Sequence, residues 1–198
     1  MKTNLFNPFN QIAGVKSLAI GLAAILLTLL AAGYNGVHFP DTLSIKVGDS
    51  LHFKFLAIQI VANWVIISSL LYVAALLLSK SAVRAIDIYG TQALARGPHL
   101  VAAIICFSDA SIKFGKYMLW KSLNQGEAVC LSSAQMSLAI LQMIIVSLMA
   151  IWTILLSVNA FKVSDNVKGG KLAAIYIICL IISMVITGYL SSSIYQLS

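Results

Sequence analysis

The sequence is poor in charge and lacks the common catalytic motifs. Only 10% of its 198 residues are charged, whereas 60% are hydrophobic, so too little polar surface is available for a soluble domain. The apolar runs contain no HExxH zinc helix, no GxSxG elbow and no pair of carboxylates. Three scattered cysteines give neither a disulfide framework nor a metal-binding spacing. We therefore predict that the chain is not an enzyme and has no catalytic, cofactor-binding or metal-binding residues.

The basic residues do not form a stripe. The chain has 13 Lys and Arg residues against 6 Asp and Glu residues, a net charge of +7, but they occur singly, in loops. This distribution is typical of membrane proteins, and nucleic-acid binding would need a continuous basic surface. We expect the lipid bilayer, and no nucleic acid, as a partner.

The hydrophobic residues are concentrated in long runs. Runs of about 18 to 25 residues cross a hydrocarbon core of roughly 30 Å as helices. They predict an all-α, polytopic transmembrane helix bundle that forms a single integral membrane domain over residues 1–198. Five spans are expected, at about 17–33, 55–78, 98–120, 134–156 and 172–190. The first run could instead be a signal peptide cleaved after Ala31-Ala32-Gly33, but its apolar core would be unusually long.

The third run differs from the other four, because it contains Asp109, Lys113 and Lys116. Asp109 and Lys113 are four residues apart with the acid first, so they can form an ion pair on a helix and ease insertion. In the alternative geometry, residues 98–107 dip into the membrane and residues 108–123 lie along its surface. We favour a full crossing. The excess of basic residues supports a cytoplasmic N-terminus, with eight inside against five outside, but the count is the same for four spans.

Two connecting segments carry structural signals. Leu43, Ile45 and Val47 alternate with polar residues and glycine, which predicts a strand and a small β-hairpin in the first external loop. Residues 79–96 predict a short interfacial helix that ends at Gly97-Pro98.

Five polar residues within or beside the apolar runs are candidate functional residues: Gln59, Asn63, Asp109, Lys113 and Gln142. Amides in membrane helices commonly form hydrogen bonds between helices. The alternative is that these side chains line a path for a transported ion or solute.

The layout also resembles a known family. A short arm with Asn7-Pro8-Phe9, five apolar segments, and the junctions Arg96-Gly97-Pro98 and Asn166-Val167-Lys168-Gly169-Gly170-Lys171 are similar to the bacterial branch of the Yip family, the Ypt-interacting proteins of membrane trafficking. The resemblance implies five helices and a cytoplasmic N-terminus. It supplies no reaction and no catalytic residue, and an arm of about 16 residues is short for the GTPase contacts of eukaryotic members.

We thus expect a non-enzymatic, multi-pass protein of the bacterial inner membrane that acts as a scaffold or organiser. Its partners would be other membrane proteins or further copies of itself. A small transporter or channel subunit, with a polar path near Asp109 and Asn63, is the alternative.

Overall fold

The computed structural model describes residues 7–47, 51–78, 83–123, 126, 128–165 and 170–197. Over these residues the chain is mainly helical. The elements are η1 (Pro8–Asn10), α1 (Gly14–Asn35), β1 (Val37–His38), β2 (Lys46–Val47), α2 (Phe53–Leu78), α3 (Ala85–Leu94), α4 (Gly97–Ile105), α5 (Ala110–Leu123), α6 (Ser133–Asp165) and α7 (Gly170–Leu197). The predicted all-α class is confirmed. The glycine at position 48, next to the predicted strand, and residues 166–169 of the junction named above lie outside the described residues.

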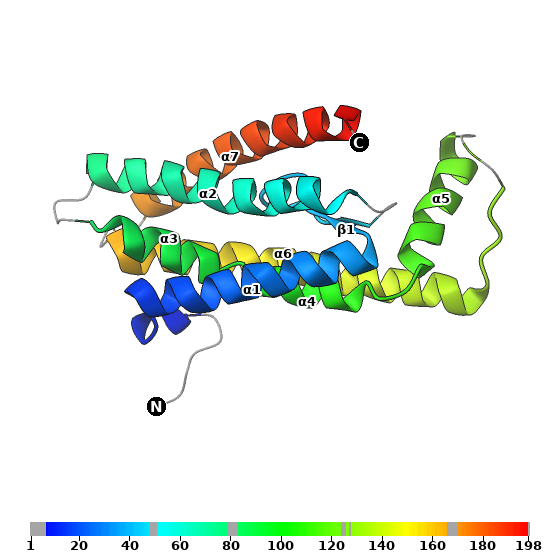
Figure 1. The fold of residues 1–198 in the computed structure, drawn as a ribbon, viewed down its shortest axis with the longest axis horizontal. Helices are drawn as coiled ribbons and strands as arrows, with labels where there is room; N and C mark the ends of the chain where they lie inside the picture. Colours follow the sequence, from blue (N-terminus) through cyan, green and yellow to red (C-terminus); the bar gives the residue numbers. More distant parts are fainter. Residues whose placement is uncertain are drawn as a thin grey trace.

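Among the described residues, four helices are long and apolar enough to cross a membrane: α1, α2, α6 and α7. They correspond to four of the five predicted spans, and they lie along roughly the same axis in Figure 1, with successive members antiparallel for α1 and α2 and for α6 and α7. Each carries large hydrophobic side chains on its outer surface as well as toward its neighbours. A helix that is apolar on all sides is typical of a membrane span, so the fold is consistent with a membrane protein.

α3 and α4 follow one another along α1 (Figure 1). Gly90 of α3 lies against Gly14 and Ser17 at the start of α1. Near the other end of α1, the Asn35 side-chain amide donates a 2.7 Å hydrogen bond to the Ala103 carbonyl of α4. The broken pair therefore runs parallel to α1 over most of its length. The short helix predicted within residues 79–96 is present as α3. Its packing between α1, α2 and α6 is closer to that of a bundle helix than to that of an interfacial helix.

The predicted span 98–120 is not one helix. α4 ends at Ile105, and α5 begins at Ala110 and turns steeply away from the bundle (Figure 1). The break is stabilised by another helix, since the Ile105 carbonyl accepts a 2.8 Å hydrogen bond from the Gln142 side chain of α6 instead of continuing α4. The Ser108 hydroxyl then accepts a 3.4 Å hydrogen bond from the backbone N–H of Ala110, the first residue of α5. Two separate helices, α4 and α5, are closer to the alternative geometry of the sequence analysis, in which residues 98–107 and residues 108–123 are separate segments.

Glycines allow α1 and α3 to approach closely. A Cβ atom built on Gly21 would lie 2.5 Å from the Ala93 Cβ atom and from the Leu94 backbone nitrogen. A Cβ atom built on Gly90 would lie 2.7 Å from the Ser17 hydroxyl. Small residues at such crossings let membrane helices gain van der Waals contact without a hydrophobic driving force.

The predicted hairpin is present. β1 and β2 pair antiparallel, with Val37 opposite Val47 and His38 opposite Lys46. The segment that joins them turns into the bundle, where Phe39 is buried. Irregular backbone is thus packed among helices, so its carbonyl groups need hydrogen-bond donors from neighbouring side chains.

Candidate functional site

The break between α3 and α4 places an arginine inside the protein. Pro98 occupies the first turn of α4 and has no N–H to donate to the preceding turn. The chain bridges the break with short-range bonds from Arg96 N–H to the Ala93 carbonyl and from His99 N–H to the Arg96 carbonyl. The Arg96 side chain is 6% exposed, so the guanidinium must find its partners within the fold.

Arg96 binds backbone carbonyls. Its two terminal nitrogens donate 2.9 Å hydrogen bonds to the carbonyls of Thr42 and Asn63. Thr42 belongs to the segment between β1 and β2, whereas Asn63 belongs to α2. Arg96 therefore links the broken helix to the hairpin segment and to α2 at one point.

Other buried side chains hold the same segment. The Asn63 amide donates a 2.7 Å hydrogen bond to the Phe39 carbonyl, and the Ser191 hydroxyl of α7 donates a 2.6 Å bond to the Pro40 carbonyl. The hydroxyls of Thr42 and Ser183 share a 2.7 Å hydrogen bond. Buried non-helical backbone needs hydrogen-bond partners within the protein. α2, α7 and the broken helix supply them here.

The turn of the segment is stabilised from within. One Asp41 carboxylate oxygen accepts 2.8 Å hydrogen bonds from the backbone N–H groups of Leu43 and Ser44. This aspartate also interacts electrostatically with Arg96. The buried positive charge thus has a negative group in its vicinity, as buried ions require.

A small cavity lies beside the arginine. His99 stacks on Phe39 with ring centroids 5.0 Å apart, and both residues line the cavity with Asn63 and Arg96. Its volume is about 10 Å³ for the centre of a water-sized sphere, enough for a single water molecule. His99 Nε2 and Asn63 Oδ1 are buried and have no hydrogen-bond partner among the described residues. A water molecule is the smallest group that would satisfy them.

Gln59, one turn before Asn63 on α2, is 1% exposed. Neither its amide nitrogen nor its amide oxygen has a hydrogen-bond partner among the described residues. A buried amide without hydrogen bonds destabilises the fold, so Gln59 is a second place where buried polar atoms lack partners among the described residues.

Gln142 of α6 belongs to a different polar cluster. Its amide nitrogen donates to the Ile105 carbonyl at 2.8 Å and to the Ser108 hydroxyl at 3.2 Å, and its amide oxygen accepts a 2.6 Å bond from the Ser111 hydroxyl. Gln142 therefore ends α4 and fixes the start of α5. Its contacts give it a structural role.

Asp109 and Lys113 form the predicted ion pair, with 2.6 Å between the carboxylate and the ammonium. Both side chains are exposed, at 62% and 43% respectively. The hydrogen bond from Lys113 lowers the pKa of Asp109. Among the described residues, no hydrogen bond or ion pair connects this pair to Asn63, and neither residue lines the cavity.

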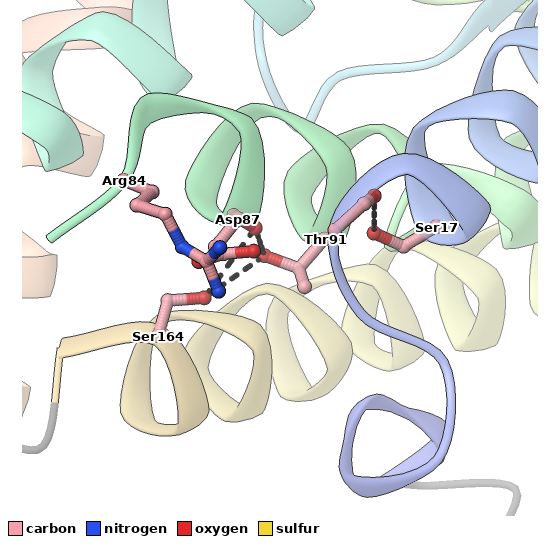
Figure 2. Close-up of polar contacts among 6 residues, drawn as sticks. Ser17, Arg84, Asp87, Thr91 and Ser164 are labelled. Carbon is pink, nitrogen blue, oxygen red and sulfur yellow. Dashed lines mark hydrogen bonds and ion pairs between the residues drawn. The ribbon is translucent and has the colours of Figure 1, made fainter.

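The opposite end of α3 carries a separate polar cluster, shown in Figure 2. Arg84 pairs with Asp87 at 3.2 Å. The Asp87 carbonyl accepts hydrogen bonds from the Thr91 hydroxyl at 2.7 Å and the Ser164 hydroxyl at 3.5 Å. Because Ser164 lies on α6, these contacts join α3 to α6. On α1, the Ser17 hydroxyl donates a 2.8 Å hydrogen bond to the Gly14 carbonyl of its own helix. The cluster supports helix packing and contains no orphaned polar atom among the labelled residues.

The five candidate residues thus separate into three places. Gln59 and Asn63 lie on one face of α2, Gln142 lies at the junction of α4 and α5, and Asp109 with Lys113 lies on the exterior. The sequence prediction missed Arg96, which was assigned to a junction, and His99, which was assigned to the third apolar run. The usable signal was an arginine between apolar segments directly before Gly97-Pro98, because a charged side chain placed there must find its partners within the fold.

The chain matches no model of a protein family, no curated protein and no solved structure.

Proposed function

We propose that the chain is a five-pass membrane protein in which the pair α3–α4 forms the third pass. The 21 positions from Ala85 to Ile105 rise about 31 Å at 1.5 Å per residue, close to the thickness of a hydrocarbon core. The pair runs parallel to α1, as a third pass must when the first begins on the same side. Seven basic residues then lie on the N-terminal side against five on the other, with Arg96 buried between them.

We further propose that this protein is not an enzyme and acts as a scaffold that organises other membrane proteins. The observation that carries this proposal is the outer face of α6. In the most apolar 18-residue stretch of α6, only 17% is buried inside the protein, whereas the corresponding share is 33% for α2 and for α7. Large side chains are exposed along it, among them Ile144, Leu148 and Ile151. Such a face can pack against the helix of another protein, whereas the cavity beside Arg96 offers room for only one water molecule.

Photo-crosslinking in native membranes tests the scaffold proposal. A photoreactive amino acid is placed at Ile144, Leu148 or Ile151, and at the buried position Ala139 as the control. We expect the same protein, another membrane protein or a second copy, to be captured from all three outer positions and not from Ala139. Adducts with lipid alone at every outer position would contradict a scaffold role.

The transporter alternative is favoured by one specific observation, the helix break that holds Arg96 beside a cavity. Broken helices near the membrane centre are common at transport sites, and a buried arginine would favour an anion. Chloride efflux from proteoliposomes should then disappear in Arg96→Met and persist in Arg84→Met, because Arg84 is exposed. Absence of efflux for the unchanged chain would count against an anion pathway.

A further inference from the structure

α5 and the first half of α6 enclose a groove. Its apolar walls include Ile45 and Val47 at β2, Phe114 and Met118 of α5, and Met143 of α6. The volume is about 340 Å³, within the usual range for a small-molecule site. On its other side, Phe114 and Met143 continue into a shallower apolar surface with Ile140, Ile144 and Leu148. The groove is therefore continuous with the outer face of α6.

The contacts of Gln142 establish the depth of the groove in the bundle. Gln142 lines the groove and binds the carbonyl of Ile105, the last residue of α4. α1 ends at the same level, since Asn35, its last residue, binds Ala103. The groove thus lies where two of the proposed passes end. At this level the hydrocarbon of a bilayer gives way to the headgroups.

α5 has the character of an interfacial helix. It lies steeply across the direction of the bundle in Figure 1, and its groove-lining residues Ser111, Phe114, Gly115 and Met118 recur every three or four positions. From residue 109 to residue 123 the chain has three lysines and one aspartate. Such helices place lysines near headgroups and apolar side chains near acyl chains.

One lysine stands next to the groove. Lys121 follows Met118 by three positions, so the two side chains are neighbours on the surface of α5. Its ammonium donates a 2.9 Å hydrogen bond to the Tyr117 hydroxyl and lies 5.3 Å from the centre of that ring. Lys113, in contrast, is paired with Asp109.

We propose that the groove between α5 and α6 binds one acyl chain of an anionic phospholipid, whose headgroup contacts Lys121. The inference depends on the five-pass part of the proposed function, because that proposal places the end of α4, and with it α5 and the groove, at the surface of the bilayer. Lipid tails are as apolar as the groove, so the groove does not distinguish the acyl chain of one phospholipid from that of another. The selectivity for an anionic lipid comes from the charge on α5.

The structure provides a matched pair of filling variants. A Cβ atom built on Gly115 meets nothing within 4 Å, so Gly115→Phe places a ring in the groove without a clash at its Cβ. Gly188 of α7 is equally open and does not line the groove, so Gly188→Phe is the control. Lys121→Gln and Lys113→Gln form a second pair, in which each variant removes one positive charge.

The experiment is native mass spectrometry of the full chain, mixed in detergent with phosphatidylglycerol or with phosphatidylcholine of the same acyl chains. We expect the unchanged protein and Gly188→Phe to retain phosphatidylglycerol preferentially. Gly115→Phe should lower its retention to the level of phosphatidylcholine. Lys121→Gln should lower it about fivefold, as expected for one lysine near a membrane surface, and Lys113→Gln should lower it less.

Equal retention of the two lipids by the unchanged protein would overturn the proposal, as would equal behaviour of Gly115→Phe and Gly188→Phe. A protein dimer that Gly115→Phe disrupts would assign the groove to a second copy instead of a lipid. These failures differ from a failure of the five-pass proposal. In that case Cys130 would be on the same side of the membrane as the N-terminus, whatever the result with lipid.

Discussion

Arg96 is the residue on which the polar interior depends most directly. It is a buried cation that bonds to two carbonyls, and one of those carbonyls belongs to irregular backbone that has no helix to satisfy it. Without the guanidinium, the Thr42 carbonyl loses a charged donor in surroundings where water is scarce. The segment between β1 and β2 would then be held by Asn63, Ser183 and Ser191 alone.

Arg96→Met should lower the free energy of unfolding by about 3 kcal/mol, the loss expected for two hydrogen bonds from a charged group. The measurement is the unfolding midpoint of the purified protein in detergent. The control is Arg84→Met, which removes the other arginine of the chain at a position 79% exposed and should change stability by no more than about 0.5 kcal/mol. Equal effects of the two variants would show that Arg96 does not hold the segment.

The exposed ion pair on α5 has a measurable electrostatic signature. Because the Lys113 hydrogen bond lowers the pKa of Asp109, Lys113→Gln should raise that pKa toward the ordinary aspartate value. The pair stabilises the fold above the unfolded-state pKa of Asp109, and this contribution is lost as the pH falls through the lowered folded-state pKa. Carboxyl NMR titration of the protein in micelles checks the shift, with Lys121→Gln as the control. An unchanged Asp109 titration in Lys113→Gln would contradict the pairing.

At the scale of elements, the crossing of α1 and α3 is the tightest contact described above. Gly21→Ala would push a methyl group into Ala93 and the Leu94 backbone, both 2.5 Å from the new atom. Backbone cannot move aside as a flexible side chain can, so we expect a loss of roughly 1–3 kcal/mol. Thermal unfolding in detergent measures it.

Gly188→Ala is the matched control for this contact, because the new methyl group meets nothing within 4 Å. It should leave stability unchanged or raise it slightly through helix propensity. If Gly21→Ala is as stable as Gly188→Ala, α1 and α3 are farther apart than described here.

The sequence predicted the long apolar helices α1, α2, α6 and α7 because each is apolar over most of its surface. It did not predict that α3 continues into α4 along α1, since Asp87, Gln92 and Arg96 lower the hydropathy of this segment and each is satisfied by tertiary or local polar contacts. The run 98–120 looked continuous because Ser108 and Asp109 are a small interruption in composition. The break depends on Gln142 of another helix, which no local pattern reveals.

The same reasoning applies to the candidate site. Asn63 and Gln142 were predictable as amides in apolar runs, and both form hydrogen bonds between elements. Arg96 escaped prediction because its partners are backbone carbonyls, which leave no trace in side-chain chemistry. Asp109 and Lys113 were correctly paired by their spacing, but their exposure argues against a shared path with Asn63.

At the scale of the whole molecule, the irregular hairpin segment, the broken helix and α7 meet at Thr42, Arg96 and Ser183. The interior around them is thus occupied by protein, whereas the face of α6 and the groove beside α5 are open to other molecules. A protein built in this way is suited to contacts with its surroundings. This conclusion depends on α3–α4 as a true pass, because that pass decides on which side of the membrane α5 lies.

The most direct test of this claim is the labelling of Cys130, which is exposed and lies between α5 and α6, whereas Cys106 and Cys179 are buried. A membrane-impermeant maleimide is applied to intact cells, with permeabilised cells as the control for reactivity. The double variant Arg84→Cys, Cys130→Ser moves the exposed thiol to the segment before α3 and marks the N-terminal side. Five passes predict that the unchanged protein is labelled in intact cells and that the double variant is labelled only after permeabilisation. Labelling of both proteins only after permeabilisation would place Cys130 and position 84 on the same side, and would mean that α3 and α4 do not cross the membrane.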